Sequence, residues 1–318
     1  MKALVLSNLK MSLQNVEVPK PDKGECLIKV KLAGICNTDL EIIKGYMNFS
    51  GIAGHEFVGV VEESPDESFL GKRVVGEINI GCGKCGFCLS GNKEHCTDRS
   101  VLGIFNKNGV FAQYITLPLE NLFIVPDSVS DEESVFVEPL AAVIRIFDQV
   151  KIRPNTRIGI LGDGKLALLI AMVLQSSGFY KFSIFGHHKS KLDLIKDQNT
   201  EKFLTVHENQ FQSYDYIVEA TGSQTGFEQA LNLLKPQGTL ILKSTIAGLS
   251  NFNLAPIVIN EINLIGSRCG RFMPALNMLS AKKIDLSDMI TAKYNINNWE
   301  IAFERAEEKD SLKILLEL

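Results

Sequence analysis

The residues best suited to chemistry gather in one short stretch near the amino terminus. Cys36, Thr38 and Asp39 are followed closely by His55 and Glu56. Thiolate and imidazole groups are ligands that a borderline-soft ion such as zinc prefers. A catalytic zinc takes three protein ligands and keeps a fourth position open for water or substrate. This stretch therefore predicts part of a catalytic metal site.

A further protein ligand has to come from elsewhere in the chain. Our candidate is Glu138, which precedes a proline at the start of a long apolar helical stretch. The hydroxyl of Thr38, two residues after Cys36, could pass on the proton of a bound alcohol. Asp39 could accept the second ring N–H of His55 and so fix the tautomer of that ligand. The alternative is a buried cysteine and a core histidine that lie together by chance.

Four further cysteines form the most specific metal-binding pattern in the chain. They are Cys82, Cys85, Cys88 and Cys96, and the glycines between them allow the backbone to curl around an ion. Four thiolates complete a tetrahedral shell, so the pattern predicts a structural zinc that holds a loop with little core of its own. An iron–sulfur cluster is the alternative. The seven-residue gap before Cys96, and the absence of a proline after it, favour zinc.

A glycine-rich turn in the second half predicts a nucleotide site. The apolar segment 158–161 is followed by Gly162, Gly164, Lys165 and Leu166, and then by a long apolar helical run. A G-x-G-x-x-A spacing between a strand and a helix is typical of dinucleotide binding, because the glycines and the helix N-terminus receive the pyrophosphate. The alternative is a tight turn without a ligand.

The end of the next predicted strand bears on the kind of nucleotide. In NAD sites an acidic residue about 20 positions after the glycines accepts the ribose 2′-hydroxyl. Here the strand ends in Gly186, His187, His188 and Lys189, without a carboxylate. A small residue followed by basic side chains leaves room and positive charge for a 2′-phosphate, so the sequence favours NADP(H), with NAD(H) possible. The alternative is a solvated loop face.

The elements that must position these residues follow two patterns. Short alternating segments with Gly and Pro between them predict a β-rich domain up to about residue 130. A long helical run is expected over 133–150. Strands then alternate with helices, which predicts a parallel sheet with helices on both faces. The tail from residue 274 has two helical stretches and a last strand candidate at 311–316, and is expected to return to the first domain.

Length and composition limit the possible classes of protein. The 318 residues, 45% hydrophobic and 22% charged, are ample for two globular domains. A net charge of −4 argues against a nucleic-acid or anionic-membrane partner. No apolar run is long enough for a signal peptide or a membrane span, so we expect a cytoplasmic protein. In that reducing compartment the seven cysteines are expected to be metal ligands or free thiols.

Together these motifs resemble those of the zinc-containing medium-chain alcohol dehydrogenases, and within them the sorbitol, threonine and glucose dehydrogenase branch. The segments that carry the resemblance are G-I-C-x-T-D, G-H-E-F-x-G-x-V, the four-cysteine pattern, V-E-P-L and E-A-T-G at 219–222. The resemblance implies an α/β chain with a GroES-like catalytic domain over 1–138, completed by 269–318. It implies a Rossmann domain, a doubly wound parallel sheet, over 139–268.

The resemblance also implies roles for single residues. Cys36, His55 and Glu138 would bind the catalytic zinc, Glu56 would lie beside it and exchange onto the metal, and Thr38 would relay the proton. The four-cysteine lobe would hold the structural zinc, and Thr221 and Gly222 would contact the nucleotide. Two features depart from the branch. Asn37 stands where Gly is usual, and the segment from Lys191 to Tyr214 leaves little room for the usual further strand and helix.

The expected activity is hydride transfer between a nicotinamide cofactor, NADP(H) favoured, and an alcohol, polyol or sugar. One alternative is the same fold acting on a bulky biosynthetic substrate. Another is a nucleotide-binding redox sensor that has lost the chemistry, against which the intact Cys36, Thr38, His55 and Glu138 argue. Because relatives form dimers or tetramers, we expect a homo-oligomer, with no nucleic-acid or membrane partner.

Overall fold

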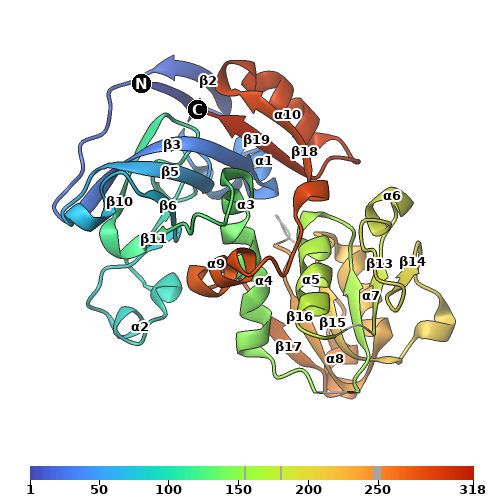
Figure 1. Cartoon of the computed structure of the whole chain (residues 1–318). Helices are drawn as coiled ribbons and strands as arrows, with labels where there is room; N and C mark the ends of the chain where they lie inside the picture. The colour runs from blue at the N-terminus through green and yellow to red at the C-terminus, as the bar shows by residue number, and fades with distance from the viewer. Residues whose placement is uncertain (154, 180, 246–251) are drawn as a thin grey trace. The chain divides into compact units, whose positions relative to one another are not determined.

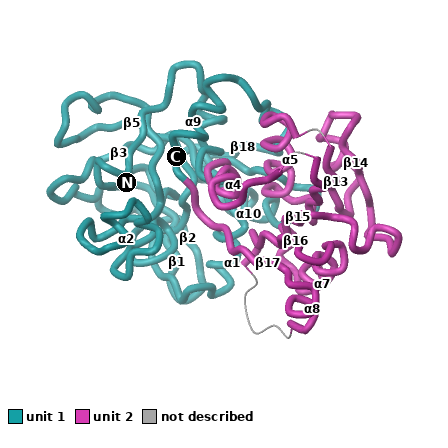
Figure 2. The backbone as a smooth tube through the Cα atoms, turned by 90° about the horizontal axis from the view of Figure 1, so that it is seen from below, with its two compact units in different colours: residues 1–139, 271–318 teal, residues 140–270 magenta. Residues whose placement is uncertain are grey.

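The computed structural model describes residues 1–153, 155–179, 181–245 and 252–318. The chain divides into two compact units, one of residues 1–139 with 271–318 and one of residues 140–270 (Figure 2). The first unit consists mainly of antiparallel strands, and the second contains a parallel sheet with helices (Figure 1). These are the two architectures that the sequence predicts.

One large sheet organises the first unit, in the order β11-β6-β5-β3-β19-β18, with β10 paired to β3 off this path. The long central strand β3 alternates between buried and exposed residues only near its middle, since neighbours and helices cover most of it. The tail returns to this sheet, as expected, because β19 pairs antiparallel with β3 and parallel with β18. The strand bounds are β3 Glu25–Ile35, β5 Glu56–Glu63, β6 Arg73–Gly76, β10 Tyr114–Pro118, β11 Leu122–Ile124, β18 Ile290–Asn295 and β19 Lys313–Glu317.

Smaller sheets and short helices complete the first unit. The sheets have the orders β2-β1-β4 and β7-β8-β9. Their strands are β1 Lys2–Ser7, β2 Lys10–Asn15, β4 Gly51–Ile52, β7 Asn79–Ile80, β8 Ser100–Leu102 and β9 Asn106–Lys107. The helices are α1 Asn37–Ile43, α2 Gly86–Leu89, α3 Asp131–Val135, α9 Phe272–Ser280 and α10 Trp299–Glu307.

The single helix predicted over 133–150 is two helices. The first, α3, begins with a capping box in which Ser130 and Glu133 satisfy each other's backbone N–H groups. The second, α4 (Val137–Gln149), starts after a break at Phe136. Pro139 explains the break. A proline is accepted in the first turn of a helix, but in one continuous helix its ring would clash with the backbone carbonyl of Val135, one turn earlier.

The second unit is built on a six-stranded parallel sheet in the order β14-β13-β12-β15-β16-β17. Its register aligns Leu161 with Phe185 on one side and with Glu219 on the other. The turns that follow these three residues therefore leave the sheet at one edge. The bounds are β12 Ile158–Leu161, α5 Lys165–Ser176, β13 Phe182–Phe185, α6 Lys189–Leu192, β14 Glu201–Phe203, β15 Tyr214–Glu219, α7 Gln224–Leu233, β16 Leu234–Leu242, α8 Ala255–Ile259 and β17 Asn263–Gly266.

The short segment between α6 and β15 still supplies one more strand. β14 has three residues and extends the sheet beside β13. The usual helix after it is reduced to a single 3₁₀ turn, Glu208–Gln210. The sequence expectation of little room therefore holds for the helix and not for the strand.

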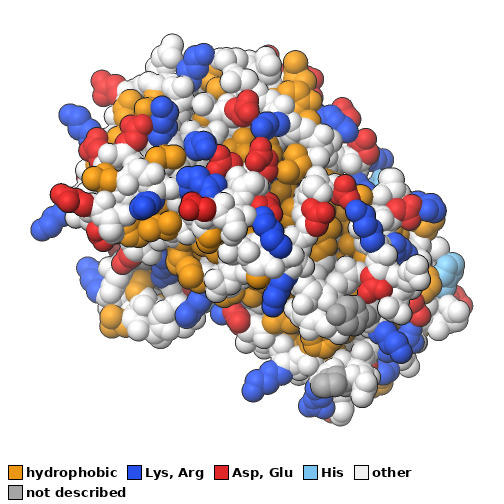
Figure 3. Space-filling view, viewed as in Figure 1, with side chains coloured by type: hydrophobic (Ala, Val, Ile, Leu, Met, Phe, Trp, Pro, Cys, Tyr) orange, Lys and Arg blue, Asp and Glu red, His pale blue; other side chains and the backbone are white. Residues whose placement is uncertain are grey.

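The surface carries charges of both signs. On the face shown in Figure 3, acidic and basic side chains are interspersed, without a continuous basic area. No helix in the described ranges is both long enough and apolar enough to cross a membrane.

Candidate active site

The junction between β3 and α1 positions the cysteine thiol. Cys36 follows the last residue of β3 and is the N-cap of α1. Its backbone N–H donates to Asp39 Oδ2 at 2.8 Å, which closes the first turn. Thr38 lies in the same turn, and its Oγ1 is 3.7 Å from Cys36 Sγ. A thiol and a hydroxyl are thereby fixed side by side.

Asp39 also fixes the histidine. His55 immediately precedes β5, and its Nδ1 lies 3.2 Å from Asp39 Oδ1, in a contact that the sequence predicts. Both side chains are buried. An Nδ1–H donated to Asp39 leaves Nε2 as the ligand atom. Burial acts to lower the pKa of His55, but the charge and hydrogen bond of Asp39, with Cys36, outweigh it and hold that pKa well above its ordinary value.

A third ligand atom completes a compact group. Cys36, His55 and Glu56 each offer one ligand atom, and these atoms lie within 4.8 Å of one another. Glu56 Oε1 is buried and has no hydrogen-bond partner among the described residues. A buried carboxylate oxygen without a partner is costly, and a cation removes the cost. One thiolate, one imidazole and one carboxylate therefore fit a zinc ion.

Glu138 lies outside this compact group. It stands in the first turn of α4 and is not among the residues whose ligand atoms fall within 4.8 Å of one another. Its charge nevertheless contributes to raising the pKa of Lys313, so it is close to the site. The structure thus brings Glu56 into the ligand group more closely than Glu138, which the sequence reasoning ranked first.

Lys313, the first residue of β19, is a member of the site that sequence reasoning missed. Its Nζ donates a hydrogen bond to Glu56 Oε2. The strand β3 lies between β5 and β19, and its Gly34 pairs with Glu56 on one side and with Leu315 on the other. The side chains of Glu56 and Lys313 both lie against this glycine. A Cβ on Gly34 would lie 2.5 Å from Glu56 Oε2, so only glycine leaves room. The signal in the sequence is one lysine at the start of an apolar strand.

The four-cysteine lobe closes as predicted. The ligand atoms of its four cysteines lie within 4.8 Å of one another. Backbone N–H groups of Lys84 and Cys85 lower the pKa of Cys82 to about 6, whereas burial and the neighbouring cysteines raise the pKa of Cys88 to about 12. A Cβ on Gly81 would lie 2.6 Å from Cys88 Sγ, so this glycine is required by close approach. The arrangement fits a closed four-thiolate zinc shell.

The predicted nucleotide residues share one edge of the parallel sheet. Gly162 has a φ of +119°, and a Cβ there would meet the Ala220 carbonyl oxygen at 2.7 Å. Gly164 is the N-cap of α5, where Lys165 and Leu166 begin the helix and its free N–H groups. Gly186 follows β13 at the same edge. Thr221 and Gly222 follow β15, and the Gly222 N–H donates to Ser244 Oγ at 2.8 Å.

An aspartate inside the glycine turn organises the loop after β13. Asp163 Oδ2 accepts the backbone N–H groups of His187 and His188 at 2.6 and 2.7 Å and lies 2.9 Å from His188 Nδ1. Burial acts to raise the pKa of Asp163, but these hydrogen bonds outweigh it and lower that pKa. Lys189 Nζ lies 2.6 Å from Asp193 Oδ2. Of the predicted basic side chains, His188 and Lys189 thus lie against acidic residues of the same chain.

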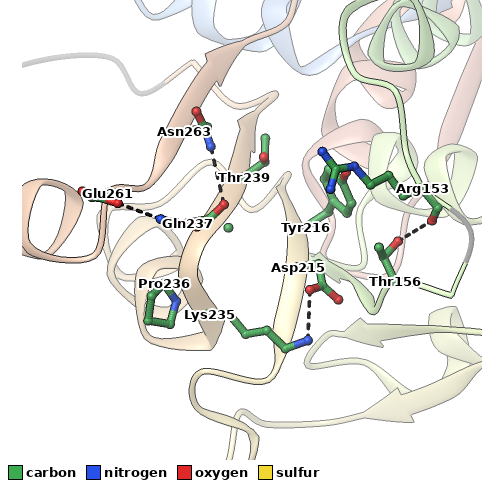
Figure 4. Close-up of a pocket in the computed structure, with 11 residues that line it drawn as sticks. Arg153, Thr156, Asp215, Tyr216, Lys235, Pro236, Gln237, Thr239, Glu261 and Asn263 are labelled. Atoms are coloured by element: carbon green, nitrogen blue, oxygen red, sulfur yellow. Dashed lines mark hydrogen bonds and ion pairs between the residues drawn. The ribbon is translucent and has the colours of Figure 1, made fainter.

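A separate pocket of about 470 Å³ lies at the opposite edge of this sheet (Figure 4). It is lined by the starts of β15, β16 and β17. The charged side chains Lys235 and Asp215 pair with each other at 2.9 Å across it. Glu261 accepts from Gln237 at 2.8 Å. This pocket holds none of the predicted metal or nucleotide residues.

Comparisons with known proteins identify the class to which this fold and site belong. Residues 22–127 match the alcohol dehydrogenase GroES-like domain, and residues 132–318 match the glucose dehydrogenase C-terminus. The chain therefore belongs to the zinc-containing medium-chain alcohol dehydrogenase family. This confirms the GroES-like and Rossmann fold class and the assignment as an oxidoreductase.

Three similar proteins cover nearly the whole chain. A sorbitol dehydrogenase of Halalkalibacterium halodurans is 28% identical over an alignment 340 positions long, which covers 99% of each chain. A short chain alcohol dehydrogenase of Escherichia coli CFT073, solved with NADH, has a TM-score of 0.91 at 24% identity and covers 100% of this chain and 99% of its own. A putative zinc-binding dehydrogenase of Sinorhizobium meliloti 1021, bound to NADP, has a TM-score of 0.89 at 24% identity, with coverage of 100% and 99%.

Proposed function

We propose that this chain transfers a hydride between a nicotinamide dinucleotide and the hydroxyl or carbonyl group of an alcohol, polyol or sugar, with the help of a bound zinc. The observation that carries the proposal is the compact group of half-buried Cys36 with buried His55 and Glu56, in which Glu56 Oε1 has no hydrogen-bond partner among the described residues. The sorbitol dehydrogenase among the similar proteins favours a polyol as substrate.

Different residues of the site would bind the zinc and relay the proton. Cys36, His55 and Glu56 would hold the catalytic zinc, with Glu138 as the alternative carboxylate. When bound, the zinc supplies a Lewis acid and the nicotinamide accepts or gives the hydride. Thr38, beside the thiol at 3.7 Å, would relay the hydroxyl proton of the substrate, accepting it while passing its own proton on to the nucleotide ribose or to water.

Asp39 positions two of the proposed zinc ligands. It joins the backbone of Cys36 to the ring of His55 at 2.8 and 3.2 Å, so that both ligands are positioned before metal and substrate arrive.

In the four-cysteine lobe we propose a second, structural zinc, which would stabilise the loop without taking part in the reaction. We also propose that the enzyme is a homo-oligomer, which light scattering on the purified protein tests.

The first experiment combines metal analysis with turnover. We expect two zincs per chain and oxidation of polyols with formation of reduced nucleotide. Cys36→Ser should lose one zinc and all turnover while nucleotide binding persists. Cys26→Ser, a buried thiol outside both clusters, should keep both zincs and serve as the matched control. A Cys36→Ser protein that retains two zincs and full activity would overturn the proposal.

A second comparison identifies the carboxylate ligand. Glu56→Gln and Glu138→Gln each remove one charge from a candidate. We expect Glu56→Gln to weaken zinc binding more than Glu138→Gln does. The reverse order would show that Glu138 is the ligand and that Glu56 only exchanges onto the metal.

The same turnover measurements separate the alternative functions. Turnover on bulky hydroxy compounds alone would favour the biosynthetic alternative, and two zincs without turnover on any substrate would favour the redox sensor.

The same assay is run with NAD(H) and with NADP(H) to identify the preferred nucleotide. The basic loop predicts NADP(H), and this stays a prediction. The structure adds a carboxylate beside that loop, which argues for NAD(H).

A further inference from the structure

The strand-end position that carries the ribose-binding acid in NAD sites has no side chain in this protein, yet a carboxylate lies beside it. Gly186 directly follows β13. A Cβ built on Gly186 would lie 2.5 Å from Asp163 Cβ, 2.7 Å from Asp163 Oδ2 and 2.8 Å from Asp163 Cγ. The side chain of Asp163 therefore fills the space that a residue at position 186 would use.

Hydrogen bonds fix the orientation of this carboxylate. Asp163 Oδ2 accepts from the backbone of His187 and of His188 and contacts His188 Nδ1, all at 2.9 Å or less. Asp163 Oδ1 receives no hydrogen bond from the described residues. The side chain is 13% exposed, so it is held at the surface of the sheet edge with one oxygen available. A carboxylate in this state is ready to accept from a hydroxyl group.

The same contacts occupy several of the donors that a 2′-phosphate would need. Consecutive backbone N–H groups after a strand form a concave anion site, and here both N–H groups already bind Asp163 Oδ2. His188 is directed to the same oxygen, and Lys189 lies 2.6 Å from Asp193. A phosphate placed here would also meet the negative charge of Asp163 at close range.

We propose that Asp163 takes the place of the missing acid at the end of β13, accepts the adenosine ribose hydroxyls through Oδ1, and makes NAD(H) the preferred nucleotide. This inference rests on the proposed use of a nicotinamide dinucleotide. It departs from the NADP(H) prediction because that prediction did not count Asp163, whereas the structure sets the His188 ring against Asp163 and pairs Lys189 with Asp193. Asp163 thus acts as a specificity-determining residue supplied from the glycine turn.

Direct binding tests this without any substrate. Fluorescence titrations with NADH and NADPH would be run on the zinc-replete wild type, Asp163→Asn and Asp215→Asn. The asparagine at position 163 keeps the shape and an acceptor oxygen but removes the charge. Asp215 is a matched control, because it also accepts a backbone N–H, that of Arg157 at 2.7 Å, and a lysine contact, but at the opposite edge of the sheet.

We expect the wild type to bind NADH about tenfold or more tightly than NADPH, as a close like charge disfavours the phosphate. Asp163→Asn should raise the NADPH-to-NADH affinity ratio about tenfold or more, and Asp215→Asn should leave it unchanged. Wild-type preference for NADPH, or an unchanged ratio in Asp163→Asn, would overturn the inference while leaving the proposed function intact. Binding of neither nucleotide to the wild type would overturn the proposed function and this inference with it.

A swap variant guards against a folding defect in the single substitution. Asp163→Gly combined with Gly186→Asp moves the carboxylate to its usual position and vacates the space that its Cβ requires. We expect the swap to restore NADH preference, whereas Asp163→Gly alone should lose it. If the swap and Asp163→Gly gave the same ratio, the carboxylate would not set the preference. The Gly186→Asp change alone would clash with Asp163 and is not informative.

Discussion

Lys313 Nζ donates a hydrogen bond to Glu56 Oε2, and the two side chains are only 2% and 1% exposed. The pair spans three neighbouring strands, because β3 with Gly34 lies between β19 and β5. One oxygen of Glu56 is held by a cation of the protein, and the other is buried without a partner. The carboxylate is therefore held in position by the protein before any metal binds.

Removing the side-chain charge of Lys313 tests how far the buried Glu56 depends on it for stability. Lys313→Met leaves Glu56 buried without its cation, and we expect a loss of about 3–5 kcal/mol in the free energy of unfolding of the metal-free protein. The loss should be smaller with zinc bound, since the metal offsets the same charge. Urea unfolding with and without chelator measures both. Lys293→Met, an exposed lysine on β18 paired with Glu132, should cost less than about 1 kcal/mol. Equal losses for the two variants would contradict this account.

The glycine between the two strands gives a second prediction. Gly34→Ala places a Cβ 2.5 Å from Glu56 Oε2 and 2.7 Å from Val135 Cγ1. Both neighbours must move, so we expect a loss of about 1–3 kcal/mol in stability and a large loss of turnover. Gly266→Ala, whose Cβ would meet nothing within 4 Å, is the control and should leave both unchanged. Thermal unfolding and steady-state rates decide, and wild-type values for Gly34→Ala would refute the crowding argument.

The two metal sites should be separable by substitution. Cys96→Ser removes one ligand from the four-cysteine lobe, and we expect it to lose one zinc, lower the unfolding temperature and expose residues 81–97 to protease. Cys36→Ser should lose the other zinc without exposing that segment. Metal analysis and limited proteolysis with mass spectrometry report these outcomes. Loss of both zincs from either variant would show that the sites depend on each other.

The hydrogen bonds to Asp163 also predict a pH dependence of stability. Because they lower its pKa in the folded state, Asp163 contributes stability above its unfolded pKa of about 4, and this contribution is lost as pH falls through the lower folded value. The difference in unfolding temperature between the wild type and Asp163→Asn should therefore be constant near neutral pH and shrink below about pH 4. A difference that grows on acidification would contradict the sign.

Local spacing was enough to predict much of the site. The cysteines of the lobe lie close together in the sequence, and the Asp39–His55 contact joins residues 16 positions apart. The two-domain fold class was equally readable, because alternation of strands and helices is a local pattern. Lys313 could not be found this way, since its contact with Glu56 spans 257 positions and depends on the register of β19 against β3.

Other misses have a similar physical origin. The role of Asp163 depends on one side chain reaching from the glycine turn to a loop 24 residues later, and composition alone showed only the basic residues there. The break at Phe136 was readable from Pro139, but the apolar pattern on both sides masked it. The sequence placed Glu56 beside the metal but ranked Glu138 ahead of it, because the room that Gly34 leaves for Glu56 is a property of paired strands rather than of either segment.

The position of β19 in the first sheet has a consequence for how the protein is made. Glu56 is synthesised 257 positions before Lys313, and Cys36 and His55 earlier still. Until β19 docks, β3 has an open edge beside the ligands, and Glu56 has neither its cation nor its cover. A chain arrested before residue 313 carries every predicted zinc ligand but not the buried pair that sets one of them. Maturation of the metal centre thereby depends on the synthesis and docking of β19.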